Sequence, residues 1–228
     1  MNVRIPSKLK GVELNDYLFH KQLPPHFYSG PLFRIDESGT IELGKPKMIF
    51  VLLNPRDDGN VSVHPKDEMH FNNLIEEMNN WFESPKAEKN YPLYNNCERF
   101  ISEYFKEEKG LKKYWNLRKN NACIVDLFPF YSVKTDLKIG NELPGKYLNS
   151  ILEGLSKANC PLIIGGKMAS DLLKKIYGKE RKNGIGARIG IYEINNQTIY
   201  SFSALSGQAL AQRDIKGACR IIEEHLKK

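Results

Sequence analysis

Uninterrupted apolar runs are the clearest pattern along the chain, and they predict buried strands. Residues 48–53 (Met-Ile-Phe-Val-Leu-Leu) show no polar alternation, which is typical of a strand covered on both faces in a parallel sheet. Residues 122–130 and 161–166 begin with similar apolar runs. Residues 189–194 and 198–202 flank Asn195-Asn196, whose composition predicts a hairpin turn between two further strands.

Segments with apolar residues at helical spacing lie between and after these strands. They cover residues 71–78, 97–105, 147–155, 168–177 and 215–226. Because strands alternate with helices, we expect an α/β fold, a three-layer α/β/α sandwich around a short, mostly parallel sheet. Residues 1–44 are rich in aromatic residues and turn formers but have little periodicity. We therefore expect them to form an irregular N-terminal arm of a single domain that spans residues 1–228.

Polar residues follow the first of these strands directly, in the order Asn54-Pro55-Arg56-Asp57-Asp58. Pro55 has no N–H to donate to a ladder and favours an extended backbone at Asn54, so the strand should end there. In open α/β sheets, ligands bind in the crevice beyond the carboxyl ends of the strands. These side chains are therefore candidates for a functional site, although a solvated turn would use the same residues.

Composition and charge narrow the function only modestly. The 34 basic and 27 acidic residues give a formal charge of +7, which favours polyanionic partners but is common in proteins without them. The four cysteines lie far apart with no C-x-x-C pair, and the histidines show no ligand-like spacing with them, which argues against a metal site or a disulfide framework. No run approaches the roughly 18 apolar residues of a membrane span. We expect a cytoplasmic protein that needs no membrane, metal or cofactor.

The strand ends, taken in order, carry Asn54-Pro55, Asp126, Gly165-Gly166 and the late segment 203–208 (Ser-Ala-Leu-Ser-Gly-Gln). This succession resembles the uracil-DNA glycosylase superfamily, and most closely its mismatch-specific uracil/thymine branch. In that branch a strand ends in Gly-Ile-Asn-Pro-Gly and a late loop reads Asn-Pro-Ser-Gly. The spacing of His64-Pro65 and His70-Phe71 also resembles the Tyr-Pro and His-Phe-Trp-Lys segment of that branch. The similarity spans about residues 46 to 224, and the order and spacing of the motifs carry it.

The resemblance implies a glycosylase that flips a base out of DNA and hydrolyses the bond between base and sugar. Asn54 would hold the attacking water, and the carbonyl before or at Pro55 would help to position it. An asparagine is no strong base, so oriented dipoles would have to supply most of the rate. Asp57 or Asp58 would add a carboxylate base that the mismatch branch lacks, unless these aspartates only cap the turn.

Asp126 is the most informative departure from the superfamily pattern, which usually has an asparagine there to read uracil. An ionised aspartate only accepts hydrogen bonds, and a carboxylate suits the N4 amino group of cytosine. If Asp126 reads the base, the pocket prefers a cytosine-type edge. The hydrogen bonding between them improves when either the carboxyl of Asp126 or N3 of the base is protonated. The alternative is that Asp126 caps a helix or pairs with a basic side chain.

Two further positions bear on which base fits. Arg56 replaces a glycine of the mismatch branch, so it could bind the phosphate of the target, contact hydroxyls on a bulky base substituent or form a surface ion pair. His64 falls where an aromatic ring stacks on the flipped base, and it leaves more room there. A loop histidine is also often merely solvated.

The late segment holds a second departure, because Ala204 stands where the superfamily has a catalytic histidine or asparagine. Ser203 or Gln208 would have to compensate for the lost polar group. Ser206 and Gly207 suit contacts to a DNA phosphate, and Gln208 or Leu210 would fill the gap that the flipped base leaves. A small-residue turn before a helix explains the same residues without function.

Three hypotheses follow. The first is a metal-independent, monomeric DNA glycosylase for a modified cytosine-type base, such as the hydroxymethylated or glucosylated cytosine of phage genomes, with a role in antiviral defence. The second is a repair glycosylase for uracil or mismatched thymine. The third is a catalytically silent DNA-binding protein that kept the fold.

Overall fold

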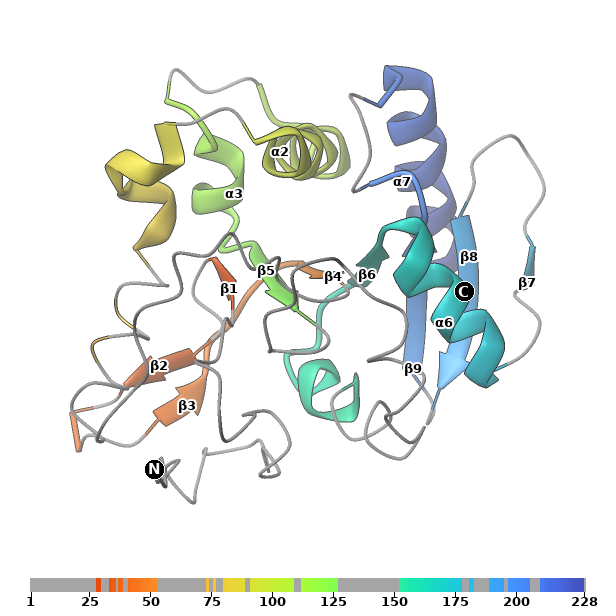
Figure 1. Ribbon diagram of the computed structural model, residues 1–228, viewed down its shortest axis with the longest axis horizontal. Coiled ribbons are helices and arrows are strands. Elements are labelled where there is room, and N and C mark those ends of the chain that lie inside the picture. Colours follow the sequence, from red (N-terminus) through yellow and green to blue (C-terminus); the bar gives the residue numbers. More distant parts are fainter. Residues whose placement is uncertain are drawn as a thin grey trace.

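A computed structural model provides the structure of the chain, and it is organised around one large sheet (Figure 1). The structure describes residues 28–29, 33–35, 37–38, 41–52, 73, 76, 80–88, 91–108, 112–126, 152–177, 181–182, 189–194, 197–205 and 210–227. Within them, seven strands form this sheet in the order β1-β5-β4-β6-β9-β8-β7. A separate two-stranded sheet joins β2 (Phe33–Ile35) and β3 (Ile41–Leu43).

The centre of the large sheet is parallel and its edges are antiparallel. Four neighbouring strands run in one direction: β5 (Cys123–Asp126), β4 (Ile49–Leu52), β6 (Leu162–Gly165) and β9 (Gln197–Phe202). At the edges the pairing is antiparallel: β1 (Tyr28–Ser29) pairs with β5, β8 (Ile189–Ile194) pairs with β9, and β7 (Arg181–Lys182) pairs with β8. Parallel central strands that are buried on both faces explain the continuous apolar runs of the sequence.

Helices cover both faces of the sheet (Figure 1). On one face, α2 (Pro92–Tyr104), α3 (Trp115–Lys119) and α7 (Gln212–Leu226) enclose an apolar core. There the ring of Phe100 in α2 meets the ring of Phe50 edge to face, with their centroids 5.8 Å apart. On the opposite face, α6 (Lys167–Tyr177) packs on β9, where the Ser201 hydroxyl donates a hydrogen bond to the Ser170 hydroxyl at 2.6 Å. The predicted three-layer α/β fold is therefore confirmed.

Most predicted elements that fall on described residues are confirmed. The apolar runs form β4, β5 and β6, and the hairpin is present as β8 and β9 with Ile194 paired to Gln197. The helices predicted at 97–105, 168–177 and 215–226 are α2, α6 and α7, and both α2 and α7 begin a few residues earlier than expected. Residues 152–156 of the helix predicted at 147–155 are helical. Of the helix predicted at 71–78 the structure describes only Asn73 and Glu76, and both are helical.

The expectation of an irregular arm over residues 1–44 is wrong for the part that the structure describes. β1 pairs with the edge of the large sheet at β5, and β2 and β3 form a small antiparallel ladder. The sequences of β2 and β3, Phe-Arg-Ile and Ile-Glu-Leu, alternate apolar and polar residues as half-buried strands do. These strands are only two or three residues long, which is too short for that alternation to stand out among the aromatic residues.

Candidate functional site

The carboxyl ends of the four parallel strands reach the same edge of the sheet, as the sequence predicts. Leu52 at the end of β4 is in register with Asp126 at the end of β5, and Gly165 at the end of β6 is in register with Phe202 at the end of β9. The segments that carry the predicted site residues therefore leave the sheet beside one another.

The structure describes only part of the predicted site. Asp126 is placed by its backbone as the last residue of β5, and Ser203 begins the turn after β9 with a half-buried side chain. The other predicted residues lie outside the described residues, namely Asn54, Pro55, Arg56, Asp57, Asp58, His64, Ser206, Gly207 and Gln208. Their assignment stays a prediction.

The turn after β9 is held against the core. The backbone N–H of Leu205 donates to the carbonyl oxygen of Phe202 at 3.1 Å, and the Leu205 side chain is completely buried. Ala204 is half-buried and packs against the core on the α2 side of the sheet. The position of Ala204 therefore faces an apolar environment, and it brings no polar group to the edge.

Gly165 and Gly166 are needed for close packing at this edge. A Cβ atom on Gly165 would lie 2.9 Å from Cδ2 of Leu205 and 3.1 Å from Cδ2 of Leu52. Gly166 has a φ of 97°, which side chains disfavour, and its N–H donates to the Phe202 carbonyl oxygen at 3.3 Å. The two glycines thus let β6 turn into α6 while Leu205 fills the space beside the strand end.

Replacing Gly165 by alanine should lower the free energy of unfolding by about 1–3 kcal/mol, because the methyl group overlaps the buried Leu205 side chain. Urea unfolding of the wild type and of Gly165→Ala measures this loss. The matched test repeats the substitution in a Leu205→Ala background, which removes the overlap with Cδ2 of Leu205 and leaves the 3.1 Å approach to Leu52, and we expect Gly165→Ala to cost less there by at least about 0.5 kcal/mol. An equal cost in both backgrounds would show that the contact with Leu205 is not the cause.

A buried asparagine of α2 holds both ends of the late loop. The side-chain Nδ2 of Asn96 donates to the carbonyl oxygen of Leu205 at 3.0 Å, and its Oδ1 accepts from the N–H of Leu210 at 3.3 Å. Asn96 is 1% exposed, so these bonds are shielded from water. One side chain therefore fixes the two points between which residues 206–209 run.

Arg99, one helical turn further along α2, anchors the start of α7. Its Nη1 donates to the carbonyl oxygen of Leu210 at 2.8 Å, and its Nη2 donates to Oε1 of Gln212 at 3.1 Å. The amide of Gln212 in turn donates to Oε2 of Glu103 at 3.1 Å. Asn96, Arg99 and Glu103 share one face of α2, which is the face turned to the late loop and α7.

The neighbouring residues of α2 have a structural role. Both carboxylate oxygens of Glu98 accept backbone N–H bonds at 2.8 Å, from Asn116 and Leu117 in the first turn of α3. Burial raises the pKa of the Glu98 carboxyl, and these two bonds oppose the rise. Burial, followed by the charge of Glu98, raises the pKa of the Cys97 thiol well above its usual value. Cys97 is thus a poor nucleophile, although it lies next to Asn96, which clamps the late loop through its two hydrogen bonds.

The sequence does not single out Asn96, although a signal for it exists. The predicted helix contains Phe100 and Ile101, and extending its apolar stripe back by one turn places Asn96 on the same face. A polar residue inside an apolar stripe must find hydrogen-bond partners when it is buried. The pattern therefore marks Asn96 as a residue with a fixed partner, but it cannot name the loop that supplies that partner.

Neither a metal centre nor a membrane segment is found in the ranges that the structure covers. No group of three or more His, Cys, Asp or Glu side chains among these residues could hold a metal ion. No helix among them is long and apolar enough to cross a membrane.

Comparison with known proteins identifies no family for this chain. No protein-family model matches it, and no curated protein is detectably similar to it in sequence. The function must therefore be inferred from the residues themselves and from the fold that brings them together.

Proposed function

We propose that this protein is a DNA glycosylase that flips out a non-canonical base and hydrolyses its bond to the sugar, with a modified cytosine-type base as the favoured substrate. The observation that supports this most is the common edge at which β4, β5, β6 and β9 end. The segments after β4 and β9 and the last residue of β5 carry the motifs that resemble the uracil-DNA glycosylase superfamily. Strands that end at one edge are what a base-excising pocket of that kind requires.

The chemistry assigns a role to each segment. As the base leaves, the sugar acquires oxocarbenium character, so water must be oriented on one side and the departing anion stabilised on the other. Asn54 holds the water, with Asp57 or Asp58 as its base. Asp126 accepts a hydrogen bond from the amino group of the base, while Arg56 and His64 line the space for a base substituent. No metal takes part in this scheme.

The clamp by Asn96 supports a DNA-binding role for the late loop. A loop that contacts a phosphate through a hydroxyl and backbone N–H groups binds better when its ends are already fixed, because less conformational freedom is lost on binding. Both ends of the segment 206–209 are hydrogen-bonded to one buried side chain. Ser206 and Gly207 would contact the phosphate, and Ser203 and Gln208 would lie beside the flipped nucleotide.

One observation favours a second candidate, a catalytically silent DNA-binding protein. Ala204 packs against the core where the superfamily has a polar catalytic side chain, so this position adds nothing to stabilise the departing base. The rate would then depend on Asn54 and the aspartates alone. Excision of uracil or mismatched thymine is the third candidate, and it depends on how Asp126 reads the base.

Release of free base from synthetic DNA separates these candidates. We expect excision from duplexes that contain hydroxymethylated or glucosylated cytosine, and little from duplexes with uracil or a thymine mismatch. Mass spectrometry of the released bases measures this directly. Asp126→Asn should shift the preference toward uracil, because an amide both donates and accepts hydrogen bonds. If DNA is bound but every base stays attached, the enzyme proposal fails, and an unchanged substrate profile in Asp126→Asn would remove Asp126 from base reading.

A further inference from the structure

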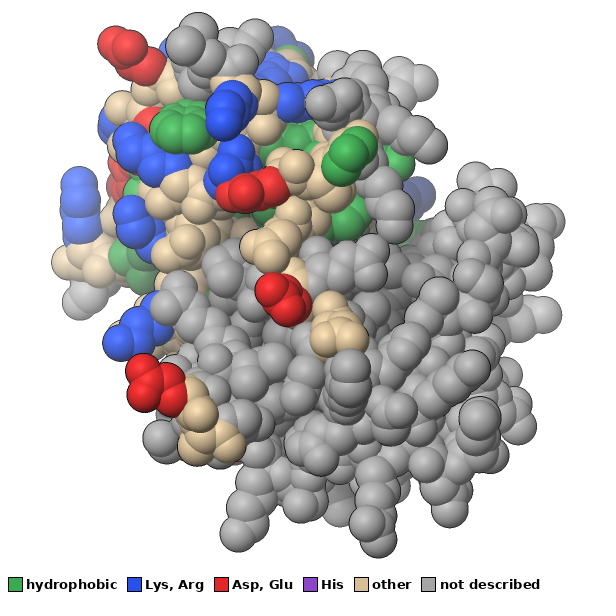
Figure 2. Space-filling model, turned by 90° about the vertical axis from the view of Figure 1, so that its left-hand side faces the viewer, with side chains coloured by type: hydrophobic (Ala, Val, Ile, Leu, Met, Phe, Trp, Pro, Cys, Tyr) green, Lys and Arg blue, Asp and Glu red, His purple; other side chains and the backbone are tan. Residues whose placement is uncertain are grey.

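A pocket of about 460 Å³ lies on the flank formed by α3 and two short 3-10 helices, η2 (Trp81–Glu83) and η3 (Pro85–Glu88). None of the lining residues that the structure describes belongs to the carboxyl edge of the sheet. Lys and Arg side chains gather over the described part of the surface on this side of the molecule (Figure 2). The volume is within the range of about 300–1,000 Å³ that is usual for small-molecule sites.

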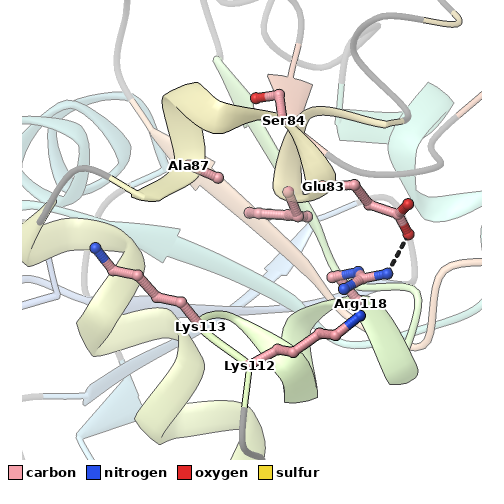
Figure 3. A pocket seen from close by; sticks show the side chains of 7 residues that line it. Glu83, Ser84, Ala87, Lys112, Lys113 and Arg118 are labelled. Atoms are coloured by element: carbon pink, nitrogen blue, oxygen red, sulfur yellow. Dashed lines mark hydrogen bonds and ion pairs between the residues drawn. The ribbon is translucent and has the colours of Figure 1, made fainter.

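The lining of the pocket is strongly basic (Figure 3). Lys112, Lys113 and Arg118 supply three cationic side chains, and Glu83 supplies the one carboxylate among the lining residues that the structure describes. Glu83 forms an ion pair with Nη2 of Arg118. Among the lining residues that the structure describes, positive charges therefore outnumber negative ones, and this favours an anion in the pocket.

The cations are carried on a firmly placed scaffold. α3 begins where Glu98 of α2 accepts the N–H groups of Asn116 and Leu117, directly before Arg118. At the other end of the pocket, the ammonium group of Lys113 lies 5.3 Å from the centroid of the Tyr114 ring. These contacts hold the backbone of α3 near the pocket, which reduces the ordering that a ligand would impose on it.

Aromatic side chains border the basic residues. The guanidinium carbon of Arg118 lies 6.0 Å from the ring of Trp115, which is 38% exposed. Buried Phe82 lines the pocket, and its ring centroid lies 5.4 Å from that of Trp81. Cations beside an exposed aromatic ring are the combination that binds nucleotides, because phosphates pair with the cations and bases stack on the ring.

We propose that this pocket binds the phosphate group of a nucleotide, either free or within a nucleic-acid strand, at a site separate from the sheet edge. Lys112, whose side chain points toward Arg118 (Figure 3), contacts the phosphate oxygens together with the N–H groups of Arg118 that Glu83 leaves unused, and Lys113 adds a positive charge at the other end of the pocket. This site does not depend on base excision, and it adds a second point at which the chain meets a polyanion.

Intrinsic fluorescence tests this proposal, because both tryptophans of the chain, Trp81 and Trp115, adjoin the pocket. Inorganic phosphate and an oligothymidylate are titrated separately into the full-length protein. We expect a saturable change in tryptophan emission. A response to inorganic phosphate points to a free phosphate compound, and a response to the oligothymidylate alone points to a nucleic-acid backbone. Either result supports phosphate binding in this pocket.

The decisive variant is Lys112→Gln/Lys113→Gln, compared with Lys174→Gln/Lys216→Gln, which removes two exposed lysines on α6 and α7. Loss of one charge-assisted contact and of a second positive charge in the pocket should weaken binding at least about tenfold in the pocket variant. For the oligothymidylate, the slope of log affinity against log salt should fall by about one to two. The control should keep its affinity and its slope. No saturable response, or equal weakening in both variants, overturns the proposal, and circular dichroism verifies that both variants fold.

Discussion

Replacing Asn96 by leucine is expected to lower the free energy of unfolding by about 2–4 kcal/mol and to loosen the late loop. The substitution leaves the carbonyl oxygen of Leu205 and the N–H of Leu210 without the partner they have in the wild type. Each buried polar group that loses its hydrogen bond costs about 1–3 kcal/mol. Leucine has the same branching and the same number of non-hydrogen atoms as asparagine and favours helices, so neither a cavity nor helix propensity should account for the loss.

Two measurements separate the loss of the clamp from a general loss of stability. Urea unfolding gives the change in free energy, and limited digestion with a protease of broad specificity, followed by mass spectrometry, reports cleavage within residues 206–209. Ser102→Ala is the matched control, because it removes a hydrogen bond from the same helix to the carbonyl oxygen of Glu107, at 2.7 Å. The control should be slightly less stable with no new cleavage in the loop. Unchanged cleavage in Asn96→Leu would contradict the clamp.

Replacing Asn54 by alanine is expected to reduce base release by about a hundredfold or more while DNA binding changes little. In the proposed mechanism, Asn54 orients the attacking water, and removing one oriented polar group of this kind costs about 10²–10³ in rate. The same proposal assigns DNA binding to the late loop and to the basic surface, which this substitution leaves unchanged. Single-turnover kinetics measure the chemical step, and fluorescence anisotropy with the same duplex measures binding.

Asn60→Ala is the control for this variant, because it removes the same amide a few residues further along the chain. It should keep the wild-type rate. If Asn54→Ala also keeps its rate, Asn54 has no part in the mechanism, and the aspartates after it become the leading candidates. If it loses binding as well as rate, the residue serves to shape the DNA-binding surface.

The central strands could be predicted because their signal is local. β4 and β6 are continuous apolar runs, and burial of both faces leaves no other pattern for a parallel strand. β8 and β9 were predictable from Asn195-Asn196 between two apolar segments. In contrast, α3 has only five residues, and its first turn is satisfied by Glu98 from another helix. Helices this short do not persist alone, so the local sequence carries little sign of them.

The candidate site, like the fold, could be predicted where the signal is local but not where it depends on contacts between distant residues. That the strand ends meet at one edge follows from a parallel sheet, and it is confirmed. The hydrogen bonds that shape the edge join residues far apart in the sequence, as Asn96 does with Leu205 and Leu210. Such pairings depend on how α2 lies on the sheet, which a single sequence does not encode in any local pattern. The role of Gly165 could be predicted in part, because a glycine at a strand end suggests close packing but does not identify Leu205 as the neighbour.

The short segment 96–99 of α2 offers a means of recognising related chains. Asn96 and Arg99 hold the loop and the start of α7, while Glu98 holds the helix that carries Arg118. A relative could exchange the residues proposed to contact the target base and still need these three residues to hold the late loop and the helix beside the basic pocket in place. A search that requires Asn-x-Glu-Arg in a helix between an Asn-Pro strand end and an acidic strand end would therefore find relatives whose substrate differs.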